Sequence, residues 1–543
     1  CIKLRLKMTD NSINADAPGM GWKKRFSVMH WPRHPSFLFL CAFIAGTLGA
    51  FSMPPANLWG CLVIALSTLY ILIGKVQSRL VCFGLGWVFG FGYFLFSLYW
   101  IGNALLIQNN DYAWAYPLAL AGLPAFLALF TAFGGAILGR RELSGFYGYL
   151  AFVAVFSTIE WCRGTFFTGF PWNLYGYTWA ESPQISQSAS LFGIYGLSAI
   201  TIAASAFPGF VLMHKQKPAA VWMTGFIVTS LFLAMFFYGQ QRLERPLSFP
   251  ENGITAVVIQ PNIPQSEKWN PKKLNENFLS HIRLTQQSQK KVLNKKTIST
   301  TEEILVFWPE SAFGPGYFES QAILEKIANT LSGFNKDAFL ITGVMRRQFS
   351  GDQENEPEYF NSIIIIDENA EVIDIYDKTH LVPFGEYIPF SNILDIAPLI
   401  GFQGLQSGKM HSNLSTGNKI KFTPLICYEA IFPYKALIDG HSSSDLLVNV
   451  TNDAWYGDSA GPHQHLHQSR FRAIEQGVPL VRAASTGISA VIDPYGRVLA
   501  KLDYGSRGLS YSRIPDKIGE KTIYSRLGES LFFSFLSLII LPV

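Results

Sequence analysis

Three segments in the second half of the chain each place a reactive side chain after a run of apolar residues. They supply the carboxylate of Glu310, the ammonium group of Lys378 and the thiol of Cys427. A thiol is nucleophilic only as the thiolate, so it needs a base or a cation nearby. Glu310 could accept its proton, and Lys378 with the backbone N–H of Tyr428 could stabilise the oxyanion formed when sulfur attacks a carbonyl. The three segments together predict acyl transfer through a thioester.

The positions of the cysteines single out Cys427. Of the six cysteines, one is the first residue, the others except Cys427 lie in long apolar segments, and Cys427 stands alone in the large polar region. This excludes a disulfide framework there, and the C-x-x-C spacing of metal sites is absent. A lone cysteine is most often a small buried packing residue, and an isolated Glu310 or Lys378 would usually lie at the surface. The chemical interpretation therefore depends on the three side chains as a set.

These side chains need a folded domain to hold them, and the sequence predicts one α/β domain from about residue 250 to residue 513. Short β-branched runs separated by helical and turn segments are typical of strands, several of them buried on both faces. The predicted strands are Ile254–Gln260, Ile304–Trp308, Phe339–Val344, Ser362–Asp367, Leu446–Val450 and Ile488–Asp493. Two packed sheets with helices on their outer faces, an α-β-β-α sandwich, are a natural arrangement.

The composition indicates a membrane protein with this polar domain attached. The chain has 543 residues, of which 49% are hydrophobic and only 15% charged, and its mean hydropathy is +0.21. The charged fraction of an ordinary soluble protein is nearer ~25%. The formal net charge of +5 is carried by short basic clusters between apolar runs. That distribution suits membrane topology and lacks the basic face or stripe of a nucleic-acid-binding protein.

Seven apolar runs precede the polar domain, and a bilayer span takes about 20 residues. They are Ser36–Ser52, interpreted as a signal anchor, and Leu58–Gly74, Leu80–Ile101, Ala113–Leu138, Phe146–Trp161, Ala189–Met213 and Ala219–Tyr238. We therefore expect a cytoplasmic N-terminal segment over 1–34, a multi-span α-helical membrane domain over 35–240 and a catalytic domain over 250–513. The apolar run within 527–543 predicts a C-terminal membrane segment that is short for a full span, and so possibly truncated.

The basic residues in the loops predict the orientation. They follow spans two, four and six, as Lys75 with Arg79, Arg140 with Arg141, and Lys215 with Lys217. The loops over 52–57 and 102–112 contain no Lys or Arg. The positive-inside rule then places the N-terminus in the cytoplasm and the catalytic domain on the other side of the membrane.

One charged pair lies at the outer end of the fifth span. Glu160 and Arg163 are three residues apart, so they can meet on one helix face. They lead into an aromatic segment that contains Trp172. Charges near the hydrocarbon are costly and usually have a partner or a function. Two interpretations stay open: a helix-end ion pair beside an interfacial aromatic belt, or a contact surface for a lipid headgroup or a membrane-tethered substrate.

The ordered motifs of the polar domain resemble the nitrilase superfamily with its Glu-Lys-Cys triad. The motifs are Trp-Pro-Glu310, Lys378-Thr-His-Leu-Val-Pro-Phe-Gly-Glu386, Ile-Cys427-Tyr-Glu429 and Thr451-Asn-Asp-Ala-Trp-Tyr-Gly457. With the upstream spans, Gly169-Phe-Pro-Trp172 and Gln260-Pro-Asn-Ile-Pro-Gln-Ser-Glu-Lys-Trp269, they resemble the apolipoprotein N-acyltransferase family of bacterial inner membranes. The resemblance covers nearly the whole chain in order.

The resemblance implies a role for each matching residue of the triad. Glu310 corresponds to the general base, Lys378 to the oxyanion-stabilising lysine and Cys427 to the nucleophile that accepts an acyl chain. Glu386 matches a second glutamate, which supports the lysine and the acceptor amine.

Three further residues match the family outside the triad. Tyr428 and Glu429 match residues beside the nucleophile, and Trp269 lies in a motif associated with substrate entry. Glu267 in that motif precedes the strand-end glutamate and is not the base.

The implied reaction is a ping-pong acyl transfer in two steps. Cys427 takes a fatty acyl chain from a phospholipid, and the α-amine of a diacylglyceryl-cysteine at the N-terminus of an apolipoprotein then attacks the thioester. The resemblance implies no cofactor, no metal and no nucleic-acid partner. It places the enzyme in the bacterial inner membrane as a multi-pass protein, with the catalytic domain on the periplasmic side.

Two other functions remain open from the sequence. A membrane-anchored amidase would use the same triad with water in place of the amine, and a scaffold or transporter would carry a catalytically inactive domain.

Two local patterns carry hypotheses of their own. The apolar stretch Ile393–Phe402 predicts either a mobile loop that enters the membrane and admits acyl chains or a packed core helix. His463, His465 and His467 resemble zinc-ligand spacing, but no H-E-x-x-H motif or cysteine set accompanies them.

Overall fold

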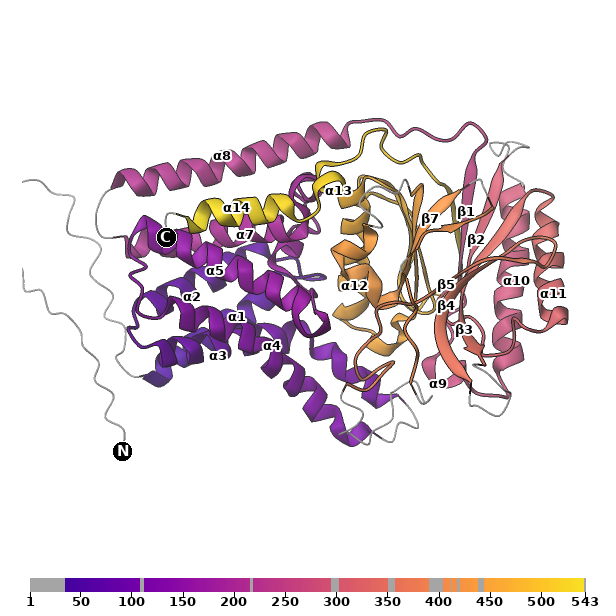
Figure 1. Cartoon of the computed structure of the whole chain (residues 1–543), viewed down its shortest axis with the longest axis horizontal. Helices are drawn as coiled ribbons and strands as arrows, with labels where there is room; N and C mark the ends of the chain where they lie inside the picture. The colour runs from indigo at the N-terminus through magenta and orange to yellow at the C-terminus, as the bar shows by residue number, and fades with distance from the viewer. Residues whose placement is uncertain are drawn as a thin grey trace, which may run out of the picture.

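The computed structural model describes residues 35–107, 112–214, 218–293, 302–349, 357–389, 404–410, 412–417, 420–437 and 444–541. The predicted N-terminal segment 1–34 and the stretch Ile393–Phe402 lie outside these residues. Within them the chain forms a helical part followed by an α/β part, and the C-terminal segment returns to the helical part (Figure 1).

The helical part consists of long apolar helices at all seven predicted positions. They are α1 (Pro35–Ala50), α2 (Trp59–Gly74), α3 (Arg79–Ser97), α4 (Tyr116–Leu138), α5 (Phe146–Thr165), α7 (Ala189–Met213) and α8 (Pro218–Leu243), with the short α6 (Pro183–Ser186) between α5 and α7. Helices α3, α4, α5, α7 and α8 are long and apolar enough to cross a membrane, whereas α1 and α2 have 16 residues each. These helices form the membrane domain, and the full count of seven spans stays a prediction.

Small residues allow the helices of this part to approach closely. A Cβ atom at Gly46 of α1 would lie 1.9 Å from the carbonyl oxygen of Phe89 on α3. A Cβ atom at Gly135 of α4 would lie 2.3 Å from the carbonyl oxygen of Cys82, also on α3. Because neither position has room for a side chain, the backbones pack directly on each other, as is common for helices in membranes.

The α/β part contains two six-stranded sheets. One has the order β12-β1-β2-β3-β4-β5 and the other β11-β10-β9-β8-β7-β6. The first sheet contains β1 (Ile254–Gln260), β2 (Glu303–Phe307), β3 (Ala338–Gln348), β4 (Glu358–Ile366), β5 (Val372–Asp377) and β12 (Gly508–Arg513). The second contains β6 (Leu414–Ser415), β7 (Lys421–Ile426), β8 (Leu446–Thr451), β9 (Leu480–Ala484), β10 (Ser489–Ile492) and β11 (Val498–Leu502).

Each sheet has three parallel strands at its centre, flanked by antiparallel strands. The parallel sets are β1, β2 and β3 in one sheet and β7, β8 and β9 in the other. Because β1 and β8 lie inside their sheets and are covered on both faces, nearly all of their residues are buried. All six predicted strands are present. Strand β3 ends four residues later than predicted, and β4 begins four residues earlier.

Helices cover the outer faces of the two sheets, which gives the predicted α-β-β-α order (Figure 1). Helices α10 (Leu274–Leu293) and α11 (Gln321–Leu331) cover the first sheet, and α12 (Ala460–Gln476) covers the second. Apolar side chains of both sheets, such as Phe307 and Val448, share one core between them. Helix α12 lies between the second sheet and the helical part, so it is shared by both parts (Figure 1).

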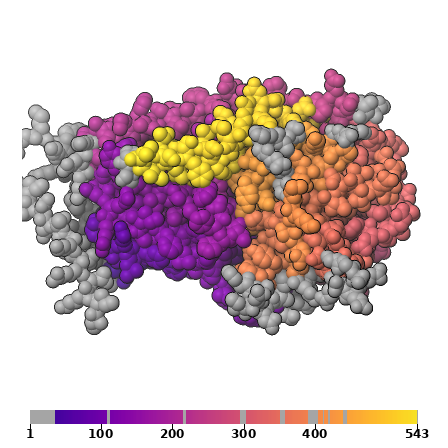
Figure 2. All heavy atoms as spheres, viewed as in Figure 1, coloured from indigo at the N-terminus to yellow at the C-terminus, as the bar shows by residue number. Residues whose placement is uncertain are grey.

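The C-terminal segment crosses from the α/β part back to the helical part. It forms α13 (Ile523–Leu527) and α14 (Ser530–Ile540), and α14 packs on α5 and α7. Figure 2 shows this segment in yellow, lying over the helical part and reaching the α/β part. The predicted C-terminal membrane segment is thus an apolar helix of 11 residues within the described chain.

Candidate active site

The three predicted catalytic residues follow strands that end at the same region of the sandwich. Lys378 directly follows β5 and Cys427 directly follows β7, while Glu310 lies three residues beyond the end of β2. The Glu310 backbone packs so tightly on Gly343 of β3 that a Cβ atom there would lie 2.5 Å from the Glu310 Cα atom. All three side chains are almost fully buried, with exposed fractions of 7% for Glu310, 1% for Lys378 and 7% for Cys427.

Cys427 lies at a tight turn where the strand becomes a 3₁₀ helix, Cys427–Ile431. Its φ angle of +49° is in the left-handed region, which costs energy for a residue with a Cβ atom. Such strain is concentrated at functional sites, because the surrounding structure must hold it. Burial, and after it the charge of Glu310, raise the pKa of the Cys427 thiol to about 12, against the opposing charge of Lys378.

A hydrogen-bond network joins Glu310 to Lys378. The Asn361 amide on β4 donates to Glu310 Oε1 at 2.7 Å and to Glu386 Oε1 at 3.0 Å. Lys378 Nζ donates to the same Glu386 oxygen at 2.9 Å. Burial alone would lower the pKa of Lys378, but the carboxylates of Glu386 and Glu310 hold it above its usual value. Lys378 is therefore a fixed cation beside the thiol.

Glu429 connects the strand end that carries Lys378 to the strand end that carries Cys427. Its Oε1 atom accepts hydrogen bonds from the Tyr376 hydroxyl at 2.7 Å, the Thr379 N–H at 3.0 Å and the His380 N–H at 3.1 Å. Its Oε2 atom accepts from the Ile426 N–H at 2.9 Å. The Glu429 side chain is fully buried, with an exposed fraction of 0%. This residue, which the sequence placed beside the nucleophile, is therefore a clamp between β5 and β7.

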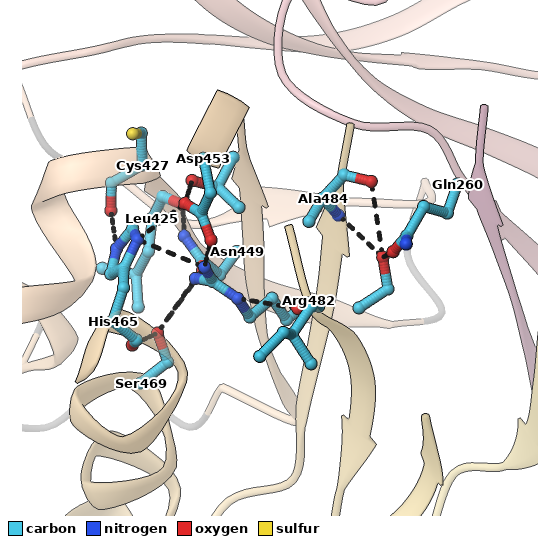
Figure 3. Close-up of polar contacts among 12 residues, drawn as sticks. Gln260, Leu425, Cys427, Asn449, Asp453, His465, Ser469, Arg482 and Ala484 are labelled. Atoms are coloured by element: carbon cyan, nitrogen blue, oxygen red, sulfur yellow. Dashed lines mark hydrogen bonds and ion pairs between the residues drawn. The ribbon is translucent and has the colours of Figure 1, made fainter. Parts of the chain in front are cut away.

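A second network lies beneath the nucleophile on α12 and β9 (Figure 3). His465 Nε2 donates to the Cys427 carbonyl oxygen at 3.0 Å, and its Nδ1 atom lies 2.9 Å from Asp453 Oδ1. Arg482 donates to Asp453 Oδ2 at 2.6 Å. Burial opposes the charge of Asp453, but Arg482 and His465 hold its pKa at about 2. Figure 3 shows the Cys427 sulfur pointing away from His465, so His465 holds the nucleophile through its backbone carbonyl oxygen and not through the sulfur.

Two of the three histidines in the sequence pattern, His465 and His467, make separate contacts within the protein. His465 bonds to the Cys427 backbone, whereas His467 pairs with Glu181 at 3.1 Å. Among the described residues, no group of three or more His, Cys, Asp or Glu side chains could hold a metal ion.

Glu160 and Arg163 form the predicted ion pair at 2.9 Å, and both are buried. The Arg163 guanidinium also donates to the carbonyl oxygens of Phe170 at 2.6 Å and Trp172 at 2.9 Å. The pair therefore holds the backbone of the aromatic segment from inside the protein. The Tyr428 hydroxyl donates to the carbonyl oxygen of Gly169 in the same segment at 3.0 Å, which connects the segment to the residue after Cys427.

Lys268 and Trp269 lie beside Glu310. Lys268 is 6% exposed, and its Nζ atom donates to the Glu310 carbonyl oxygen at 2.9 Å. Burial lowers the pKa of Lys268 to about 8, against the opposing effect of the Glu310 and Cys427 charges. The Trp269 ring packs against Gly314, where a Cβ atom would lie 3.3 Å from it. Trp269 is thus close to the site, and its role in substrate entry stays a prediction.

Comparison with known proteins identifies the family. The family model for the apolipoprotein N-acyltransferase N-terminal domain matches residues 45–207. The family model for carbon-nitrogen hydrolase matches residues 255–522. The apolipoprotein N-acyltransferase of Rhodopseudomonas palustris is 38% identical over 501 residues, which are 90% of this chain and 91% of that protein. The apolipoprotein N-acyltransferase of Agrobacterium fabrum is 38% identical over 483 residues, 86% of this chain and 88% of that protein. The chain belongs to the apolipoprotein N-acyltransferase family.

Membership in the apolipoprotein N-acyltransferase family makes the chain an N-acyltransferase and confirms the resemblance predicted from the motifs. Among solved structures, the chain is similar to Nit3 of Saccharomyces cerevisiae, described as a member of branch 10 of the nitrilase superfamily. That similarity has 16% identity and a TM-score of 0.36, and covers 55% of this chain and 98% of Nit3.

The sequence did not point to Lys268, Asn361, Asp453 or His465 as site residues of this family member. Asn361 lies in a strand-like run, and a polar residue inside such a run is a weak signal of a buried contact. Lys268 immediately precedes Trp269, so the family motif contained it without indicating its burial. His465 belongs to a histidine pattern with the spacing of zinc ligands, whereas its partners are the backbone of Cys427 and the carboxylate of Asp453.

Proposed function

We propose that this chain transfers a fatty acyl chain from a phospholipid to the N-terminal α-amine of diacylglyceryl-cysteine in apolipoproteins, through a thioester on Cys427. The observation that carries the proposal is the buried network of Glu310, Asn361, Glu386 and Lys378 next to a strained Cys427, in a member of this family. This network has the base, the cation and the nucleophile that acyl transfer needs.

In the first step, Glu310 takes the thiol proton as Cys427 attacks the ester carbonyl of the phospholipid. The raised pKa of the thiol means that sulfur gives up its proton to the base during attack and is not a thiolate beforehand. Lys378, held by Glu386, stabilises the negative charge on the carbonyl oxygen. The ester bond then breaks, Glu310 returns the proton to the leaving oxygen, and lysophospholipid departs.

In the second step, the neutral α-amine of the apolipoprotein attacks the thioester. A new amide bond forms, the carbon–sulfur bond breaks, and the proton lost by the amine passes through Glu310 to the Cys427 sulfur. Glu386 faces the same region and supports the incoming amine in this scheme. In the amidase alternative, water attacks the thioester in place of the amine. The relatives' shared name, N-acyltransferase, favours attack by the amine.

Both substrates are held in a membrane by lipid chains, so the site must lie near a bilayer surface. The proposed location is the bacterial inner membrane with the α/β part on the periplasmic side. Two features support this placement: the apolar helices directly precede the α/β part, and the basic loop residues alternate along the helical part.

Mass spectrometry of the intact protein tests the proposal. The purified full chain is incubated with phosphatidylethanolamine in detergent micelles without an acceptor, and we expect a mass increase of one fatty acyl group. Cys427→Ala should abolish the adduct, and Glu310→Gln should slow its formation by about 10²- to 10⁴-fold, because general-base catalysis contributes that range.

A matched control uses another free thiol of the chain. Cys162 on α5 is also a free cysteine, and Cys162→Ala should keep the adduct unchanged. Adding a synthetic diacylglyceryl-cysteine peptide should remove the adduct and produce an N-acylated peptide. An adduct that persists in Cys427→Ala would refute the thioester, and release of free fatty acid without N-acylated peptide would favour the amidase.

A further inference from the structure

Arg472 on α12 bonds to the end of the 3₁₀ helix Cys427–Ile431, which we call the nucleophile helix. Its side chain is fully buried, with an exposed fraction of 0%. Its Nη1 atom donates to the carbonyl oxygen of Ile431, the last residue of the nucleophile helix, at 3.1 Å. The last carbonyl groups of a helix find no partner within it, so a buried helix end needs a donor from elsewhere. Arg472 supplies this donor.

Helix α12 therefore holds the nucleophile helix at both of its ends. His465 donates to the carbonyl oxygen of the first residue and Arg472 to that of the last. The two side chains are seven residues apart, about two turns of an α-helix, so they project from the same face of α12. Between these two bonds the nucleophile helix carries the strained Cys427, the Tyr428 N–H expected to stabilise the oxyanion, and the carboxylate of Glu429.

Glu475, three residues further along α12, orients the Arg472 guanidinium. Its Oε1 atom accepts a hydrogen bond from Arg472 Nη2 at 2.9 Å, and its Oε2 atom lies 2.8 Å from Arg472 Nε. Burial would lower the pKa of Arg472, but the carboxylate of Glu475 holds it above its usual value. The guanidinium is planar and rigid, so binding Glu475 through two of its nitrogens fixes the direction of the third. That third nitrogen is the donor to Ile431.

The helical part and the C-terminal segment hold Glu475 in turn. The Ile194 N–H of α7 donates to Glu475 Oε1 at 2.9 Å, and the Thr522 hydroxyl donates to the Glu475 carbonyl oxygen. Just beyond, Tyr524 of α13 packs against α7 at Gly193, which has a φ angle of +65°. A Cβ atom at Gly193 would lie 2.2 Å from the tyrosine ring. The guanidinium that Glu475 orients is therefore tied to contacts outside the α/β part.

We infer that Arg472 is a positioning residue of the acyl transfer, which sets the place of the thiol by holding the carbonyl end of the nucleophile helix. The inference rests on the proposed function, because it concerns the attack of Cys427 on a donor ester. Arg472 bonds to the Ile431 carbonyl oxygen, to Glu475 and to the Tyr177 hydroxyl, and it does not touch the reacting atoms. It acts on the nucleophile and not on the donor. Its loss should therefore slow acylation by every donor equally.

A buried arginine in an ion pair could instead be needed only for folding, and the two roles affect a population of molecules differently. A folding defect lowers the fraction of chains that can be acylated and leaves the rate constant of the folded chains unchanged. A misplaced thiol lowers the rate constant in every chain and leaves the final acylated fraction unchanged. A misplacement of about 1 Å can cost about 100-fold in rate.

The test uses the full chain in detergent micelles and the variant Arg472→Lys. Lysine keeps the positive charge beside Glu475, but one ammonium group cannot replace the planar fork that binds Glu475 and Ile431 together. Intact-protein mass spectrometry follows acylation of Cys427 by p-nitrophenyl butyrate and by phosphatidylethanolamine, and yields a rate constant and a final acylated fraction. We expect the rate constant to fall about 100-fold with both donors, at an unchanged final fraction.

Arg470→Lys is the matched control on the same helix. Among the described residues, Arg470 donates to the carbonyl oxygens of Gly496 at 3.0 Å and Ala180 at 3.4 Å, and its Nη1 atom lies 2.9 Å from His467 Nδ1. None of these partners belongs to the nucleophile helix. Arg470→Lys makes the same chemical change two residues away, and it should leave both rate constants and the final fraction as in wild type.

Three results for the variants would overturn the inference. The first is a wild-type rate constant with a reduced final fraction, which would assign Arg472 to folding alone. The second is a loss confined to one donor, and the third is an equal loss in Arg470→Lys. A loss of rate constant with both donors in Arg472→Lys alone supports the inference.

A second variant decides the question if Arg472→Lys does not fold. Arg472→Met combined with Glu475→Met removes the whole ion pair, a change that often leaves stability intact, and it is judged by the same criteria. Failure of both variants to fold would also assign Arg472 to folding and overturn the inference. If wild type is acylated by the soluble ester and never by phospholipid, the proposed function fails, and the rate constants with the soluble ester still decide the role of Arg472.

Discussion

Lys268 places a second positive charge beside the reactive thiol, in addition to Lys378. Its Nζ atom is bonded to the Glu310 carbonyl oxygen, and the charges of Glu310 and Cys427 both act on it. A cation at this position favours the developing thiolate and the oxyanion during attack. The single hydrogen bond to Glu310 would survive loss of the charge, because a neutral amine still donates.

The lowered pKa of Lys268 predicts a pH dependence. Burial lowers the pKa of Lys268 to about 8 from its usual value of 10.5, so the side chain is mostly charged below pH 8 and mostly neutral above it. We expect the rate of Cys427 acylation by a soluble ester to fall as the pH rises through about 8. Lys268→Arg should shift this decline to higher pH because arginine keeps its charge. Lys268→Met should be slower throughout and lack the decline, as measured by pH–rate profiles.

The lowered pKa of Lys268 also makes the stability of the folded chain depend on pH. Between about pH 8 and pH 10.5 the unfolded chain binds more protons at Lys268 than the folded chain does. This group therefore makes the folded state more stable as the pH rises through that window. A pH–rate profile of Lys268→Met that superimposes on wild type would contradict a role for the charge.

At the scale of elements, the active site depends on how strand ends are joined to each other. The ends of β5 and β7 belong to different sheets, yet both converge on the carboxylate of Glu429. The nucleophile turn is further held by α12 through His465. The relative position of Lys378 and Cys427 is therefore set by one carboxylate and its backbone donors.

Glu429→Gln tests this clamp. The substitution keeps the shape but replaces one acceptor oxygen with an NH₂ group that faces donors, so we expect destabilisation on the order of 3 kcal/mol. We also expect the acylation rate of Cys427 to fall about 100-fold, because Lys378 and the thiol lose their fixed spacing. Thermal unfolding and intact-protein mass spectrometry measure the two effects. Unchanged values for both would show that Glu429 is not a clamp.

An exposed carboxylate serves as the control for this prediction. Glu276 on α10 forms an ion pair with Lys273, and the two side chains are 63% and 41% exposed respectively. Glu276→Gln should change the free energy of unfolding by less than about 0.5 kcal/mol, as surface substitutions usually do. Its acylation rate should match wild type.

Elements with a clear periodic pattern could be predicted from the sequence. The strands around Val306 and Val448 are short runs rich in Leu, Ile and Val, and such runs are recognisable without tertiary information. Each member of the predicted triad follows a strand, which is why the sequence could place the three side chains at strand ends. Their catalytic roles stay a prediction. The contacts of Asn361 with Glu310 and Glu386 could not, because they join strands that are distant in sequence and adjacent only in the folded sheet.

The contacts of the Glu160–Arg163 pair could also be predicted only in part from the sequence. The i, i+3 spacing of Glu160 and Arg163 predicted their ion pair, since helix geometry alone brings them together. The bonds of Arg163 to the carbonyl oxygens of Phe170 and Trp172 depend on how the following segment folds back, which no local pattern indicates. The proposed contact of this pair with a lipid headgroup stays a prediction.

For the whole molecule, the helical and α/β parts share one continuous apolar core. Residues of the α/β part, including Tyr428, Phe432 and Phe471, belong to the same buried cluster as the helices α1 to α7. Polar contacts add to it, because the Ile194 N–H of α7 donates to Glu475 of α12 at 2.9 Å. The α/β part is therefore built to be covered by the helices.

This shared core predicts that the α/β part does not function alone. A chain that begins at residue 246 would expose the apolar side chains of the shared cluster to water, so we expect aggregation in size-exclusion chromatography. We also expect no acylation by p-nitrophenyl butyrate. Coexpression with residues 1–245 should restore both properties and serves as the control. A monodisperse, reactive fragment would contradict the prediction.

The burial of Cys427, which raises the pKa of its thiol, also works against oxidation of the sulfur. Disulfide exchange and oxidation to sulfenic acid both require the thiolate, which this site suppresses until a carbonyl is in place. Outside the cytoplasm, where we propose that the site lies, thiols are exposed to oxidants. The 7% exposed Cys427 combines low thiolate content with restricted access. The burial that makes the nucleophile dependent on Glu310 therefore also preserves it in reduced form between turnovers.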